Sequence, residues 1–158
     1  MPTAKKLSTR RMVMTRSPRE TQAFASKFAK ELVPGDVVRL DGDLGSGKTV
    51  FVKGLARGLG LADANAVKSP TFVLMHIYKA RVPLYHFDLY RLEGAAEIES
   101  IGLEEFTHDS SAVICVEWAE RGAAFFPKSS YRVRLAITGE TTRQITIQGG
   151  RARKKGIS

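Results

Sequence analysis

The sequence contains little of what secreted and membrane-spanning proteins depend on. Its 158 residues include one cysteine, so no intrachain disulfide can form. No apolar run approaches the about 20 residues that a membrane helix requires, and no signal-peptide core is evident. We therefore expect a soluble, cytoplasmic protein. Cys115 stands in the apolar run 112–116 and is expected to be a small core residue, not a nucleophile.

Acidic residues are scarce relative to basic ones. The chain has 16 Asp and Glu against 25 Lys and Arg, a net charge of +9. Both ends are basic, and we expect residues 1–16 and 149–158 to be solvated segments, the first flexible at its start. Attraction to RNA or to an acidic protein surface is the alternative. Residues 17–148 are expected to form one domain with one core.

A glycine-rich octet, GDLGSGKT at 42–49, is the most specific motif that is present. It lies between an apolar run and a helical pattern, which is the strand-loop-helix context of a phosphate-binding loop. Glycines let successive N–H groups face one anion, Lys48 supplies a cation, and the Thr49 hydroxyl can hold Mg²⁺. The sequence therefore predicts phosphate binding by Leu44, Gly45, Ser46, Gly47, Lys48 and Thr49.

Periodicity and turn residues outline the other elements. The run SPRE at 17–20 is typical of a helix start, and phenylalanine and leucine follow at four-residue spacing as a buried stripe. Hairpins are expected at 72–78 with 84–90 and at 131–137 with 143–148, and a helix broken near Gly102 at 97–106. The uniformly apolar run 112–116 predicts a central parallel strand that is covered on both faces.

These elements together predict one α/β domain of the P-loop NTPase type. We expect a mixed, mostly parallel central sheet flanked by helices, with antiparallel hairpins. Ligands bind such folds at the carboxyl ends of the strands.

Two carboxylates are candidates for chemistry beside the loop. Glu117 follows four apolar residues at an expected strand end, and we predict that it holds Mg²⁺ directly or through water. Asp88 stands between apolar neighbours, where an unpaired carboxylate is costly to bury. It is expected to hold metal or to position water, and an ion pair with Arg91 is the structural alternative.

Three further side chains near these positions allow several interpretations. Thr71 follows a proline and resembles the switch threonines that sense a γ-phosphate, although the same dipeptide occurs in ordinary turns. Trp118 could cap the core, stack on a nucleotide or contact a partner. For His86, packing or a hydrogen bond near the site is expected and metal ligation is not, because zinc-like spacing is absent.

Four motifs in this order resemble the TsaE family. They are GDLGSGKT at 42–49, KSPTF at 68–72, HFDLYRL at 86–92 and VEW at 116–118. Only the first is widespread among phosphate-loop proteins, and the other three narrow the match. The resemblance extends from Ser17 to about Gln148 and leaves both basic ends outside.

The resemblance implies an ATPase of the bacterial machinery that forms N6-threonylcarbamoyladenosine in tRNA. It implies that the chain binds the TsaB and TsaD subunits, that its ATP hydrolysis resets the transferase TsaD, and that tRNA is reached indirectly. Residues 44–49 would bind the ATP phosphates, and Thr49 and Glu117 would hold Mg²⁺. Asp88 and Thr71 would support metal, water or switch, and Lys48 would complete the catalytic set.

Arg143 falls where the family contacts the nucleotide. No arginine finger is evident within the chain, and such a residue contributes about 10³ to 10⁵ in rate, so hydrolysis is expected to be slow without partners. A small-molecule or nucleoside kinase is the main alternative, although no arginine-bearing lid is evident. A GTPase would need guanine-reading motifs that the sequence does not contain. The non-enzymatic alternative is a basic RNA-binding module.

Overall fold

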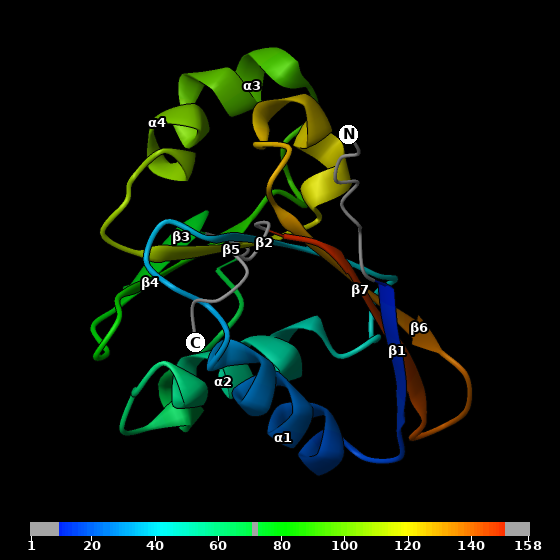
Figure 1. Cartoon of the computed structure of the whole chain (residues 1–158). Coiled ribbons are helices and arrows are strands. Elements are labelled where there is room, and N and C mark those ends of the chain that lie inside the picture. Colours follow the sequence, from blue (N-terminus) through cyan, green and yellow to red (C-terminus); the bar gives the residue numbers. More distant parts are fainter. Residues whose placement is uncertain (1–9, 71–72, 151–158) are drawn as a thin grey trace, which may run out of the picture.

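A seven-stranded sheet runs through the protein, with the strands in the order β1-β7-β6-β2-β5-β4-β3 (Figure 1). The computed structural model describes residues 10–70 and 73–150. The strands are β1 (Arg10–Thr15), β2 (Val37–Asp41), β3 (Met75–Tyr78), β4 (Leu84–Asp88), β5 (Val113–Glu117), β6 (Tyr131–Ile137) and β7 (Arg143–Gly149).

The sheet is mixed, with its parallel strands in the centre. β2 is parallel to β5 and β6, and β4 is parallel to β5. The pairs β1–β7, β6–β7 and β3–β4 are antiparallel. The mixed α/β fold and both hairpins are thus confirmed. The expectation of a mostly parallel sheet is too strong, because hairpins at both edges leave three parallel and three antiparallel pairs among the described strands.

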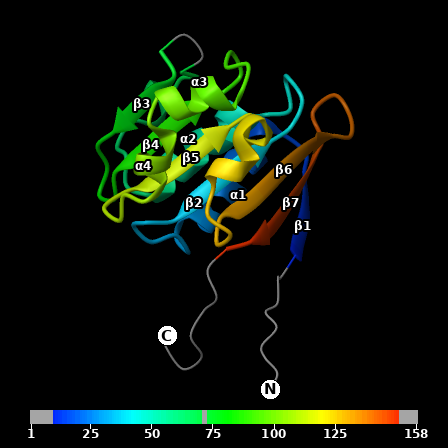
Figure 2. The ribbon, with the colours of Figure 1, turned by 90° about the horizontal axis from the view of Figure 1, so that it is seen from above.

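Helices cover both faces of the sheet. Two lie on one face, and two short helices and a 3₁₀ segment lie on the other (Figures 1 and 2). Within the described residues, no helix is long and apolar enough to cross a membrane. The helical elements are α1 (Pro18–Ala29), α2 (Lys48–Gly58), η1 (Ala64–Ala66), α3 (Ala95–Ser100), α4 (Leu103–Thr107) and η2 (Ala119–Phe125).

The start of α1 is set by a reciprocal cap. Ser17 Oγ accepts a hydrogen bond from the Glu20 backbone N–H at 3.1 Å, as the sequence predicts. The Glu20 carboxylate in turn accepts one from the Arg16 N–H at 2.8 Å. The cap fixes where α1 begins, and this matters for function because Pro18 at its first position borders the phosphate-binding loop.

The sheet separates two hydrophobic cores. One packs α1 and α2 against residues such as Leu40 and Val133, and the other packs α3, α4 and η2 against residues such as Ile114 and Phe87. All five residues of β5 are buried, which confirms the predicted central strand. The helical stretch before it breaks at Gly102, whose φ of +74° separates α3 from α4 as predicted.

The sheet begins earlier in the chain than the sequence predicts. Arg10–Thr15 were expected to be part of the basic N-terminal segment, yet they form the edge strand β1 against β7. On the side facing α1, Arg11 pairs with Glu31 at 2.8 Å, and Thr15 Oγ1 hydrogen bonds to Thr21 Oγ1 at 2.6 Å. Arg10–Thr15 therefore belong to the sheet.

Candidate functional site

The predicted phosphate-binding loop joins the end of β2 to the start of α2. Gly47 has a φ of +103°, a conformation that side chains with a Cβ rarely adopt. A Cβ on Gly42 would lie 2.7 Å from the Leu135 carbonyl oxygen, so the backbone approaches too closely for any other residue. Ser46 is fully buried, and its Oγ has no hydrogen-bond partner among the described residues. The loop thus forms a backbone cradle with an unsatisfied hydroxyl inside it.

Lys48 is held over this cradle. Its Nζ donates hydrogen bonds to the carbonyl oxygens of Gly42 at 2.6 Å and Asp43 at 3.1 Å. Burial lowers the pKa of Lys48 below its ordinary value, and nearby carboxylates, Glu117 foremost, oppose that shift. The lysine is therefore a partly desolvated cation that faces acidic side chains.

Trp118 contacts the loop lysine directly. Lys48 Nζ lies 4.4 Å from the centre of the indole ring, within the range of a cation–π interaction. The Tyr90 ring packs against the Trp118 ring, and the two ring centres lie 4.9 Å apart. Trp118 has a φ of +57°, so the chain turns sharply just after β5. Trp118 also packs against the core beneath α3, α4 and η2, as the first of the three interpretations predicts.

The two predicted carboxylates lie side by side near the loop. Asp88 and Glu117 are paired in the register of β4 and β5, and both are almost fully buried. Asp88 accepts hydrogen bonds from Ser69 Oγ at 3.0 Å and from the Tyr90 N–H at 2.8 Å. It therefore ties the segment after α2 to the end of β4. No pattern in the sequence indicates that Ser69 is its partner.

Glu117 has a different partner. Its Oε2 lies 2.5 Å from Nε2 of His86, a residue that is fully buried on β4. The expectation of a hydrogen bond near the site for His86 is confirmed. The other ring nitrogen, Nδ1, has no hydrogen-bond partner among the described residues.

The remaining predicted residues divide into two groups. Thr49 lies in the first turn of α2, directly after Lys48, and is half-buried. Thr71 lies outside the described residues. Thr49, Asp88 and Glu117 offer hydroxyl and carboxylate oxygens, which are the ligands that Mg²⁺ prefers. In residues 10–70 and 73–150, no three acidic, histidine or cysteine side chains gather to hold a metal by themselves.

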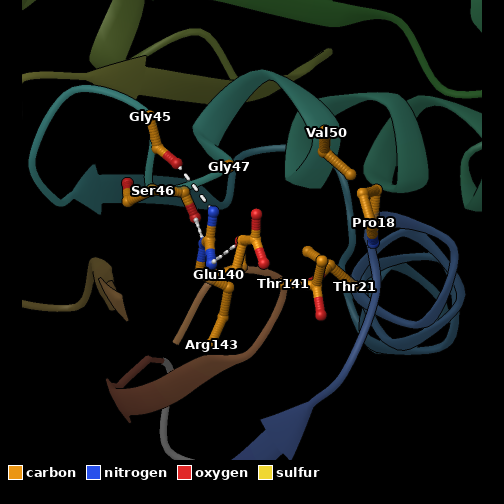
Figure 3. A pocket seen from close by; sticks show the side chains of 9 residues that line it. All are labelled: Pro18, Thr21, Gly45, Ser46, Gly47, Val50, Glu140, Thr141 and Arg143. Atoms are coloured by element: carbon orange, nitrogen blue, oxygen red, sulfur yellow. Dashed lines mark hydrogen bonds between the residues drawn. The ribbon is translucent and has the colours of Figure 1, made fainter. Parts of the chain in front are cut away.

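Arg143 braces the loop from the β6–β7 hairpin (Figure 3). Its Nε donates to the Ser46 carbonyl and its Nη2 to the Gly45 carbonyl, both at 3.0 Å. Its Nη1 donates to the Gly139 carbonyl at 3.1 Å, which anchors the hairpin turn as well. Arg143 therefore joins two segments almost a hundred residues apart in the chain.

A pocket opens where these segments meet (Figure 3). The start of α1 forms one wall, the phosphate-binding loop and α2 another, and the hairpin turn the third. Its lining residues are Pro18, Thr21, Gly45, Ser46, Gly47, Val50, Glu140, Thr141 and Arg143. The sequence predicts the loop and Arg143 but not the wall from α1, because no local pattern indicates which distant helix start packs beside the loop.

The comparisons with known proteins agree with this arrangement. The family model described as "Threonylcarbamoyl adenosine biosynthesis protein TsaE" matches residues 15–145. A tRNA threonylcarbamoyladenosine biosynthesis protein TsaE from Bacillus subtilis is 43% identical over 134 residues, covering 84% of this chain and 82% of the relative. One from Treponema pallidum is 37% identical over 134 residues, covering 85% and 97%.

A solved structure matches as well. The crystal structure of YdiB from Bacillus subtilis superposes with a TM-score of 0.73 at 33% sequence identity, covering 92% of this chain and 88% of that one. The sequence relatives and this structure match over most of their own lengths. With its loop, paired carboxylates and mixed sheet, the chain belongs to the TsaE family of threonylcarbamoyl adenosine biosynthesis proteins.

Proposed function

We propose that this chain is a cytoplasmic, Mg²⁺-dependent ATPase that acts with TsaB and TsaD to form N6-threonylcarbamoyladenosine in tRNA. The observation that carries the proposal is the position of Lys48, which lies over the loop and faces the buried carboxylates Glu117 and Asp88. A cation and two carboxylates beside a backbone cradle are the parts that phosphoryl transfer to water requires. The names of the curated relatives supply the pathway.

The loop would bind the phosphates through residues 44–49. Lys48 donates to two carbonyl oxygens of its own loop, and a phosphate oxygen is a stronger acceptor for the same ammonium group. The unsatisfied Ser46 hydroxyl is a further group that a ligand oxygen can reach by a small rearrangement. We infer that nucleotide binding draws Lys48 away from its carbonyl partners and toward the ligand.

The pocket beside the loop would receive the nucleoside. Pro18 and Val50 give it apolar walls, whereas Glu140 and Thr141 contribute polar side chains. Such a mixture suits a base and a ribose, which are flat and apolar on their faces and polar at their edges. Arg143 would act on the nucleotide through the loop that it braces.

Thr49, Glu117 and Asp88 would hold Mg²⁺ together with phosphate and water oxygens. When bound there, the ion would neutralise charge that develops on the phosphate oxygens. His86 would keep one Glu117 oxygen fixed through their hydrogen bond. Asp88, which is held by hydrogen bonds from Ser69 and the Tyr90 N–H, would position water or metal. Thr71 would sense the γ-phosphate.

Hydrolysis would be slow without partners. Arg143 donates to five backbone carbonyl oxygens, so its guanidinium is not directed at a transferred phosphate. An arginine or an ordering contact from the TsaB–TsaD pair would then complete the site.

The test is ATP turnover with and without TsaB–TsaD. Lys48→Ala and Glu117→Ala are expected to abolish turnover, with Glu117→Ala retaining more nucleotide binding. Lys53→Ala, a change in the same helix one and a half turns away, serves as the control. Turnover by the isolated chain at about 1–100 s⁻¹, as in kinases, would contradict the proposal. So would a phosphorylated acceptor formed without any partner.

Nucleotide binding has its own readout in this chain. Trp118 is the only tryptophan, and its ring lies 4.4 Å from Lys48 Nζ. Movement of the lysine toward a phosphate should change the indole fluorescence, and Lys48→Ala should remove that response. Binding can therefore be measured apart from hydrolysis.

A further inference from the structure

One half of the sheet has an uncovered face. Among the described residues, α3, α4 and η2 cover the side over β5 and β4, and no helix lies over the same side of β6, β7 and β1 (Figure 2). The side chains larger than alanine that alternate onto this side form what we call the open face. Its members are Arg10, Met12, Met14, Arg132, Arg134, Gln144, Thr146 and Gln148.

The register of the strands arranges the open face in rows. Arg10 pairs with Gln148, and Gln148 pairs with Arg132 on the next strand. Neighbouring strands lie about 4.8 Å apart, so the two arginines of this row stand roughly 10 Å from each other. In the adjoining row, Met12 and Arg134 flank Thr146 in the same way.

The open face exposes both charge and apolar surface. Its three arginines are exposed, and Met12 and Met14 expose 58% and 51% of their surface. The reverse side of the same strands is ordinary core, with Ile145 and Val133 buried under α1 and α2. The methionines thus belong to the outward set of an alternating pattern.

None of the eight members of the open face is acidic, and Asp41 of β2, which pairs with Arg134, is an acidic neighbour of the face. Arg39 lies next to the open face, on β2, where it pairs with Arg132. Burial lowers the pKa of Arg39, the positive charge of Arg132 lowers it further, and the carboxylate of Asp41 opposes the shift. The chain enters the first row at Arg10 and leaves beside it after Gly149.

We propose that the open face docks an acidic protein surface, with carboxylates opposite the arginines and an apolar contact over the methionines. Arginine and methionine are enriched in protein interfaces and lysine is depleted, which matches a face with three arginines, two methionines and no lysine. A guanidinium also forms bidentate pairs with carboxylates. Sheets that bind RNA bases present aromatic side chains for stacking, and none of the eight residues is aromatic.

The open face is separate from the nucleotide site. Its arginine rows lie toward the start of β6, whereas Arg143, which braces the phosphate-binding loop, follows the other end of that strand. Arg132 pairs with Arg39 in the middle of β2, and Arg134 pairs with Asp41, which precedes the loop at Gly42. The Trp118 response to nucleotide is therefore measured for each variant as a control on the nucleotide site.

The experiment measures binding to the purified TsaB–TsaD pair. This probe is chosen because the proposed function names that pair as the partner, so the test rests on the proposed function. The variant Arg132→Glu/Arg134→Glu is compared with Lys27→Glu/Lys79→Glu, which changes the net charge equally at exposed positions on α1 and at the β3–β4 turn. The arginine variant is expected to bind at least about tenfold more weakly than the wild type, because buried arginines often carry much of the binding energy of an interface. The lysine variant is expected to bind like the wild type. Higher salt should weaken wild-type binding more than that of the reversed variant.

Two additional variants separate docking from folding. Arg132→Gln/Arg134→Gln removes the positive charge without reversing it, and Met12→Ser/Met14→Ser removes the apolar contact. Each variant should bind TsaB–TsaD more weakly than the wild type. The melting temperature and the Trp118 response to nucleotide should stay unchanged in both. Equal binding by all three open-face variants and the wild type overturns the docking proposal alone. Loss of binding to tRNA with undiminished binding to TsaB–TsaD overturns it in favour of RNA. Failure of the wild type to bind the pair overturns both proposals.

Discussion

His86 Nε2 and Glu117 Oε2 lie 2.5 Å apart although 31 positions separate the two residues in the chain. They meet because β4 and β5 are adjacent parallel strands whose side chains point to the same side at these positions. Both residues are buried, so water cannot replace either partner. The hydrogen bond therefore sets which oxygen of Glu117 remains available to the phosphate site.

His86→Leu should destabilise the protein by about 1–3 kcal/mol, because the buried Glu117 carboxylate loses its hydrogen-bond donor among the described residues. It should also slow ATP turnover by the complex. Urea denaturation measures the first effect. His86→Gln keeps an N–H donor and is expected to recover part of the loss. In a double-mutant cycle with Glu117→Gln, a coupling energy near zero would contradict the pairing.

Arg143→Lys should weaken nucleotide binding nearly as much as Arg143→Ala. The guanidinium bonds the carbonyls of Ser46 and Gly45 at once and holds the hairpin turn through Gly139. A lysine ammonium is a point charge and cannot reproduce that fork. Titration of the Trp118 fluorescence with an ATP analogue measures the affinity. Arg134→Lys on β6 is the control, and full affinity in Arg143→Lys would rule out the bracing role.

The sequence was most informative where local chemistry decides local structure. The cap at Ser17, the break at Gly102 and the loop at 42–49 each depend on neighbours within a few residues, and all appear as expected. The apolar run 112–116 likewise predicted the buried central strand β5.

Long-range packing explains what the sequence did not reveal. β1 was missed because its basic outer residues resemble a solvated segment, and only its pairing with β7 makes it a strand. The pairing of Asp88 with Ser69 and the pocket wall from Pro18 depend on contacts between distant elements. No periodicity within either segment encodes such contacts.

Gly54→Ala should destabilise the protein by about 1–3 kcal/mol despite alanine's better helix propensity. A Cβ at Gly54 would lie 2.3 Å from the Gln22 carbonyl oxygen and 2.6 Å from Ala25 Cβ, so α1 and α2 would have to separate. Gly94→Ala is the control, because a Cβ there meets no atom within 4 Å. Thermal denaturation compares the two, and equal melting temperatures would show that the helices yield freely.

The Lys48 ammonium should make stability depend on alkaline pH in a defined direction. Burial lowers its pKa in the folded chain below the 10.5 of an ordinary lysine, so the unfolded chain binds more protons between the two values. The stability of the wild type relative to Lys48→Met should therefore rise as pH increases through that interval. Denaturant titrations at several pH values measure this difference. A difference that falls with pH would show that the pKa is raised instead.

The thiol of Cys115 should react only when the protein unfolds. The side chain is fully buried at the centre of β5, and burial raises its pKa well above the 9.0 of a free thiol. In the folded state a reagent cannot reach the thiol and the reactive thiolate does not form. Labelling by a thiol reagent should therefore follow the rate of unfolding and accelerate with denaturant. Cys115→Ala should retain nucleotide binding and ATP turnover, because the residue packs in the core between the sheet and α2. Rapid labelling of the native protein, or loss of turnover in a stably folded Cys115→Ala, would instead indicate a chemical role for this thiol.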